Sequence, residues 1–198
     1  MSEATATRRP TAALTAVGHV LDRVAGAVAV LGGLVLVGMI AVSVVSIVGR
    51  SILPPISGLL GMPMRARSIP GDIELVQHGL GIAVFAFLPY CQLRRGNVIV
   101  DFFTANARHR VRAALDLLGN AIFLALASLI AWRLIAGLQD KIAFRDTTMV
   151  LRLPEAYPFA AALGCAWLLA IVCAFTVWRS VEELIVDRPI GPATASEH

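Results

Sequence analysis

Residues 24–49 read VAGAVAVLGGLVLVGMIAVSVVSIVG, a run of 26 residues without a charge that Arg50 closes. A helix of this length crosses the ~30 Å hydrocarbon layer of a bilayer with some tilt. The small residues Ala25, Ala29 and Gly33 recur at four-residue spacing, which favours close approach of another helix. The run is therefore typical of a transmembrane helix that packs against protein on one side.

The composition of the whole chain agrees with an integral membrane protein. Of its 198 residues, 58% are hydrophobic and 15% are charged, with a mean hydropathy of +0.77. A soluble domain carries roughly 25% charged residues. The net charge of +4 is better explained by basic loops at a membrane face than by nucleic-acid binding, so no nucleic-acid partner is expected.

Three further apolar runs predict an all-α protein with four transmembrane helices. Pro70-Gly71-Asp72 is a helix start signal, a turn followed by an acid that can cap the first turn. The segment 51–71 holds four prolines and is expected to be a loop. The spans are expected at about 24–49, 73–93, 114–136 and 156–178, within a membrane domain of residues 24–180.

Residues 98–118 form an amphipathic pattern between the second and third spans. We expect a short helix lying along the membrane interface there, with a linker that faces water as the alternative. Ten of the 17 Lys and Arg residues lie in the segment 1–23, in the 94–112 loop and in the C-terminal segment that starts at Arg179. Because positive charge accumulates in the cytoplasm, both termini are predicted to be cytoplasmic, and the tail 181–198 is expected to be disordered.

Polar side chains line one face of the second span. At 100° per residue that face holds Glu74, Gln77, His78, Gly81, Phe85, Leu88 and Gln92. Polar groups in hydrocarbon are costly and usually face protein or a water-filled cavity. Glu74 and His78 are one turn apart and could relay protons, but hydrogen bonds to a partner helix are the preferred interpretation.

The second span ends on Arg94, Arg95 and Gly96. Paired arginines hold a helix end at the headgroup level, and glycine terminates the helix. For Asp101, a solvated charge or local cap and a contact with the arginines remain equal alternatives. The residues predicted to contact a partner or lipid are Arg50, Asp72, Glu74, Gln77, His78, Gln92, Arg94, Arg95, Asn97 and Asp101.

Motifs for nucleotide or nucleophilic chemistry are absent from the sequence. There is no Walker loop, dinucleotide fingerprint or nucleophile elbow. A haem between helices would need paired histidines, and His78 is the only histidine within a span. Cys91, Cys165 and Cys173 lie in apolar runs without metal-ligand spacing and are expected to act as small hydrophobic residues. We therefore predict no catalytic residue, metal or cofactor.

Three elements of the sequence flank the second and fourth spans: GDIELVQ at 71–77, LRRGNVIVD at 93–101 and TTMVLRLP at 147–154. Together they resemble a known family, the small permease subunit (DctQ family) of TRAP, or tripartite ATP-independent periplasmic, transporters. Members show a G-x-x-E-L-like opening to the second span, an L-R-R-G-H-V-x-V-D-like exit and a T-x-V-L-x-[IL]-P element before the fourth. The resemblance covers about 24–180, and Asn97 stands where histidine is frequent.

The resemblance implies a subunit without enzymatic activity in the bacterial inner membrane. In such systems a periplasmic substrate-binding protein delivers an organic acid, and a large multi-span permease subunit imports it using a cation gradient, usually sodium. The small subunit binds and scaffolds the large one. Two alternatives stay open at this point: a small four-helix transporter that works alone or as an oligomer, and a membrane anchor of a redox complex.

Overall fold

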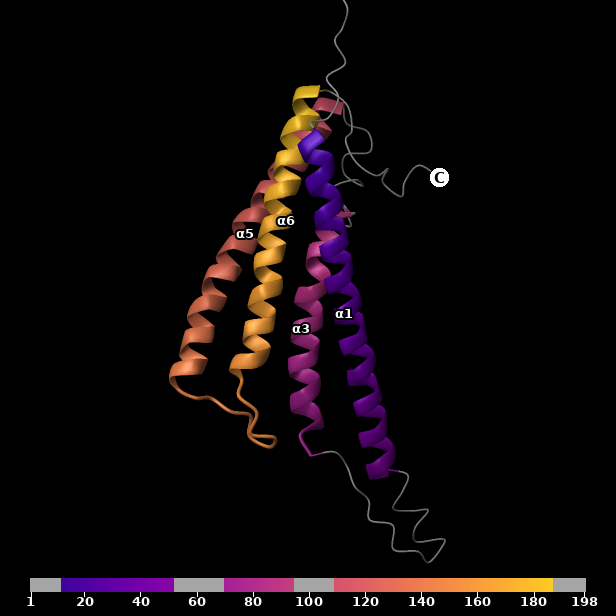
Figure 1. The fold of residues 1–198 in the computed structure, drawn as a ribbon, viewed down its shortest axis with the longest axis vertical. Coiled ribbons are helices and arrows are strands. Elements are labelled where there is room, and N and C mark those ends of the chain that lie inside the picture. Colours follow the sequence, from indigo (N-terminus) through magenta and orange to yellow (C-terminus); the bar gives the residue numbers. More distant parts are fainter. Residues whose placement is uncertain (1–11, 52–69, 95–108, 187–198) are drawn as a thin grey trace, which may run out of the picture. The chain divides into compact units, whose positions relative to one another are not determined.

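The computed structural model describes residues 12–51, 70–94 and 109–186, and these form four α-helices (Figure 1). The helices are α1 (Ala12–Ser51), α3 (Asp72–Leu93), α5 (His109–Ala143) and α6 (Ala156–Val186). Each is long and apolar enough to cross a membrane. Within the described ranges the only β-pairing is an isolated bridge between Thr147 and Pro154. The prediction of an all-α protein with four membrane-spanning helices is confirmed.

Three of the four helices are longer than the spans expected from the charge-free runs. The helix α5 takes in residues 109–118 of the expected interfacial segment and continues through Ala143, while α6 reaches Val186 in the expected tail. The rest of that interfacial segment lies outside the described residues. The difference has a simple reason: Arg, Lys and Glu end an apolar run, but they are good helix formers and do not end a helix.

The predicted start of the second span is the observed start of α3. Gly71 has a φ of +80°, a left-handed conformation that glycine adopts without steric cost. The Asp72 carboxylate accepts a hydrogen bond from the backbone N–H of Ile73 at 2.9 Å. The backbone N–H of Leu75 donates to the Gly71 carbonyl oxygen at 3.0 Å, which closes the first turn. The helix then continues through Pro89 to Leu93.

Contacts divide the chain into two units, and parts of all four helices contribute to each. Among the described residues, unit one comprises 12–27, 88–94, 109–132 and 166–186, and unit two comprises 28–51, 70–87 and 133–165.

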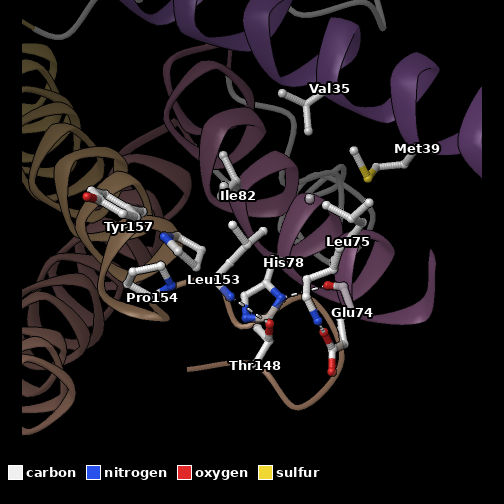
Figure 2. Close-up of a pocket in the computed structure, with 13 residues that line it drawn as sticks. Val35, Met39, Glu74, Leu75, His78, Ile82, Thr148, Leu153, Pro154 and Tyr157 are labelled. Carbon is white, nitrogen blue, oxygen red and sulfur yellow. Dashed lines mark hydrogen bonds between the residues drawn. The ribbon is translucent and has the colours of Figure 1, made fainter. Parts of the chain in front are cut away.

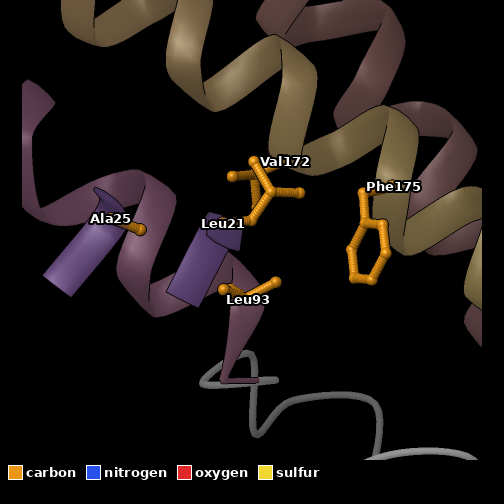
Figure 3. Close-up of a cluster of buried hydrophobic side chains, with 5 residues drawn as sticks. All are labelled: Leu21, Ala25, Leu93, Val172 and Phe175. Atoms are coloured by element: carbon orange, nitrogen blue, oxygen red, sulfur yellow. The ribbon is translucent and has the colours of Figure 1, made fainter. Parts of the chain in front are cut away.

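Unit one contains most of the buried apolar side chains that α6 contributes. Leu21 and Ala25 of α1 pack with Leu93, Val172 and Phe175 in one cluster (Figure 3). A second cluster is formed by Ala127, Leu169, Ala170 and Cys173. The burial of Ala25 agrees with its predicted role as a helix contact. Of the three cysteines expected to be buried small hydrophobic residues, Cys173 is buried, Cys165 is half-buried and Cys91 is exposed.

In unit two, small residues bring α1 and α3 close together. A Cβ atom added at Gly32 would lie 2.8 Å from the Cβ of Ala86, and one added at Gly79 would lie 2.6 Å from Met39. Small residues allow this close approach of two backbones, which is how helices in membranes gain van der Waals contact. The sequence placed the contact at Gly33, whose Cβ position has open space around it.

Candidate functional site

The side chain of Glu74 holds the loop that connects α5 to α6 (residues 144–155). Its two carboxylate oxygens accept hydrogen bonds from the backbone N–H groups of Val150, at 2.9 Å, and Leu151, at 3.1 Å. A carboxylate that accepts two successive backbone N–H groups makes charge-assisted bonds, which are the strong class of hydrogen bond. Glu74 thereby fixes the loop to the first turn of α3.

The α5–α6 loop is also braced at its base. The Lys141 ammonium group lies 2.9 Å from a carboxylate oxygen of Asp146 and 2.7 Å from one of Glu155, so it joins the two ends of the loop. Between them, the backbone N–H of Thr148 donates to the Leu153 carbonyl oxygen at 2.9 Å, and the backbone N–H of Leu153 donates to the Thr148 hydroxyl at 3.1 Å. Because its polar groups are paired internally, the loop has a defined conformation of its own.

Two of the sequence elements that carry the family resemblance contact each other here. Gly71 and Glu74 belong to GDIELVQ, and Leu151 belongs to TTMVLRLP. A Cβ at Gly71 would lie 2.6 Å from Leu151 Cγ, so glycine leaves the space that this leucine needs. Glu74 then binds the backbone beside it. Gly71 and Glu74 of GDIELVQ therefore both hold the TTMVLRLP element in place.

A largely apolar groove of about 330 Å³ lies beside this contact, within unit two (Figure 2). Its walls come from α1, α3, the loop and the start of α6. The lining residues are Val35, Met39, Glu74, Leu75, His78, Gly79, Ile82, Thr148, Leu151, Leu153, Pro154, Tyr157 and Pro158.

Unit one holds a polar network among its apolar clusters. The buried Gln92 amide donates to the Asn120 side-chain oxygen on α5 at 3.0 Å and to the Thr176 hydroxyl on α6 at 3.4 Å. The Asn120 amide in turn donates to the Ser180 hydroxyl at 2.8 Å. Hydrogen bonds of this kind join helices within a membrane. Gln92 therefore links three helices of this chain.

Arg94 at the end of α3 contacts α1. Its guanidinium group forms a salt bridge with Asp22 at 3.1 Å and lies over the ring of Tyr90, 5.3 Å from the ring centroid. Both charged side chains are partly exposed, so the pair contributes little to stability and mainly orients the end of the helix.

Some residues of the predicted polar face of the second span have partners within the chain, and others are exposed. Asp72 accepts a hydrogen bond from the Ser46 hydroxyl of α1. His78 Nδ1 donates to the Glu74 carbonyl oxygen one turn earlier, at 2.6 Å. Gln77 and Gly81 are exposed, and so is Arg50 at the end of α1. Arg95, Asn97 and Asp101 lie outside the described residues.

Several of these contacts were not predicted from the sequence. Asn120, Thr176 and Ser180 were not singled out, although an asparagine inside an uncharged run is a polar group that needs a partner in hydrocarbon. The pairing of Lys141 with two acids was also missed, because no sequence rule brings the two ends of a loop together. Across the described residues, no group of three or more His, Cys, Asp or Glu side chains could hold a metal ion.

Comparison with known proteins places this arrangement in a family. No curated protein and no solved structure matches the chain. The family model described as "Tripartite ATP-independent periplasmic transporters, DctQ component" matches residues 39–183, which include α3, the α5–α6 loop and most of α6. That match covers well over half of the chain, and it contains all three sequence elements of the resemblance. The chain therefore belongs to the DctQ family, the small-subunit component of TRAP transporters.

Proposed function

We propose that this chain scaffolds the large permease subunit of a TRAP transporter in the bacterial inner membrane. In that complex the large subunit imports an organic acid, delivered by a periplasmic binding protein, at the expense of a cation gradient. The family assignment supports a transporter component rather than an enzyme. The particular role as a scaffold rests on how the polar and small residues of the spans are distributed.

The observation that carries the proposal is the exposed pair Gln77 and Gly81 on α3. The two residues are one turn apart and so lie on the same face of the helix, where Val84 is also exposed. An amide facing lipid would leave its hydrogen-bonding groups unpaired, whereas a neighbouring protein can satisfy them. The open space beside Gly81 would let a second helix approach closely. This face of α3 is the surface that we assign to the large subunit.

The opposite face of α3 in unit two is already used within the chain. Gly79, Ala83 and Ala86 are buried there. Glu74 is likewise engaged with the α5–α6 loop, so its role in the complex would be to position that loop rather than to contact the large subunit directly. Within α3, the charged, amide and histidine side chains other than Gln77 are buried or half-buried, whereas Gln77 is exposed.

The α5–α6 loop is the second surface that we assign to a partner. With both termini predicted in the cytoplasm, this loop lies on the periplasmic side, where the binding protein acts. The side chain of Met149 is 95% exposed and that of Val150 is 58% exposed at the tip of a loop that is otherwise hydrogen-bonded internally. A preformed apolar tip suits binding, since little conformational entropy is lost when the partner arrives.

The assignment of α3 is tested by co-purification of the large subunit with tagged variants of this chain. Gly81→Leu should greatly reduce recovery of the large subunit, because the side chain fills the space a partner helix needs. Gly119→Leu in α5 is the matched control, since its Cβ position is also open and it carries the same change of a helical glycine. Equal recovery with both variants would show that the Gln77–Gly81 face is not the interface.

Transport itself is tested in liposomes that contain the large subunit and the binding protein. Uptake of an organic acid under an inward sodium gradient should require the addition of this chain. Uptake by this chain alone would instead support the alternative of an autonomous small transporter.

A further inference from the structure

We propose that the groove of unit two binds one acyl chain of a phospholipid, whose phosphate is held by Arg152. The proposal does not depend on the role in a TRAP transporter, because it rests on the walls of the groove and on the charges around it.

The groove presents an apolar wall even though four polar residues, Glu74, His78, Thr148 and Tyr157, are among those that line it. The carboxylate of Glu74 is bound to the backbone of the loop. The Nδ1 of His78 donates to the Glu74 carbonyl oxygen, and the Thr148 hydroxyl accepts a bond from Leu153. What faces the open space is therefore mostly hydrocarbon, from residues such as Val35 and Ile82, as Figure 2 shows. A flexible apolar ligand fits such a wall better than a polar solute does.

Residues of three candidate membrane spans line the groove, so an acyl chain of the bilayer can reach it. Its residues from α1, α3 and α6 belong to candidate membrane spans, whereas Leu151 and Leu153 belong to the loop that follows a span. One end of the groove is therefore bordered by hydrocarbon-facing helix and the other by the polar end of the bundle. A phospholipid has the same polarity along its length, with an apolar chain below a charged phosphate.

The charges of unit two leave a cation available at this polar end. Asp146 and Glu155 are paired with Lys141, and Glu74 is bound to backbone N–H groups. Within the described part of unit two, Arg145 and Arg152 are exposed arginines of the loop that have no acidic partner. A guanidinium group binds a phosphate through two parallel hydrogen bonds, so an anionic headgroup complements an arginine that has no acidic partner.

Of these two arginines, Arg152 is the one whose neighbours in the sequence line the groove. Its neighbours Leu151 and Leu153 both line the groove, whereas neither neighbour of Arg145 does. The two residues are otherwise alike, since both are exposed and both have a φ of +52°. This similarity gives a matched pair of variants in which only the distance to the groove differs.

The test measures binding of dioleoyl phosphatidylglycerol to the delipidated full-length chain by native mass spectrometry. One lipid per chain should bind saturably, and Arg152→Gln should weaken that binding about tenfold through loss of a charge-assisted contact. Arg145→Gln should bind as the unmodified chain does. Dioleoylglycerol, which has the same chains without the phosphate, should bind weakly and equally to all three proteins. Equal phosphatidylglycerol binding by both arginine variants would overturn the proposal.

A second variant tests the acyl chain separately from the phosphate. Leu75→Trp adds bulk to the wall of the groove and should reduce binding of the lipid while circular dichroism shows the helices intact. Unchanged lipid binding by this folded variant would contradict the proposal. In the complete transporter, a Leu153→Cys chain that crosslinks efficiently to the large subunit would also overturn it, since a protein side chain would then fill the groove.

Discussion

The close packing of α1 against α3 can be tested by moving one methyl group from Ala86 on α3 to Gly32 on α1. A Cβ at Gly32 would lie 2.8 Å from the Cβ of Ala86, and contacts under 3.0 Å are essentially never seen for real Cβ atoms. Gly32→Ala alone should therefore destabilise the chain by about 1–3 kcal/mol through overpacking. Ala86→Gly alone should cost about 1 kcal/mol of helix propensity. In the double variant the methyl group has merely changed helices, so the total loss should be about 1 kcal/mol or less.

Equilibrium unfolding in mixed detergent micelles, followed by circular dichroism, measures these free energies. The coupling between the two substitutions should be at least about 1 kcal/mol, well above the deviation expected for independent sites. Gly33→Ala is the control, because its Cβ position has open space and the change should leave stability unchanged or raise it by up to about 1 kcal/mol. Strictly additive losses at Gly32 and Ala86, or equal losses at Gly32 and Gly33, would refute this account of the interface.

Three further predictions concern the polar contacts. Gln92→Leu should lower the free energy of unfolding by about 1–3 kcal/mol, as two interhelical hydrogen bonds are lost at roughly 0.6–1.7 kcal/mol each; unchanged stability would show that the network contributes nothing. Glu74→Gln replaces one acceptor oxygen by a donor, so hydrogen exchange of the amides of Val150 and Leu151 should become faster while α6 keeps its protection. Arg94→Gln should change stability by less than about 1 kcal/mol, and only at low salt, because its ion pair is exposed.

The fold could be predicted from the sequence because hydrocarbon imposes a simple rule on it. Every backbone group that crosses a bilayer needs an internal partner, so a long uncharged run has to be helical. The same reasoning does not fix where a helix ends. Lys141 lies within the last turn of α5, where a cation also interacts favourably with the helix dipole, so the helix continues beyond residue 136, the expected end of the third span. Local signals such as Pro70-Gly71-Asp72 located a boundary better than charge did.

The candidate site was only partly predictable, since its contacts join residues far apart in the chain. The spacing of Glu74, Gln77 and Gln92 correctly marks them as polar residues on a span, but spacing cannot say which has a partner within the chain. Glu74 is 76 residues from Val150, and Gln92 is 84 residues from Thr176. For a related reason the small residues of α1 could not be sorted by the helix they contact, because the rotation of α1 relative to α3 depends on tertiary packing and not on the sequence of α1 alone.

The division of polar residues on α3 supports the proposal that a second membrane protein covers one face of this helix. A polar side chain in a span has to be paired inside its own chain, reach water or be covered by another protein. Glu74 and His78 take the first course, with partners on the loop and on the helix itself. Gln77 lies between them in the sequence and is exposed. It shares a helix face with Gly81, whose Cβ position has open space around it. In the proposed complex, a small subunit built in this way satisfies its own polar groups at the loop and leaves the face that carries Gln77 and Gly81 for the permease.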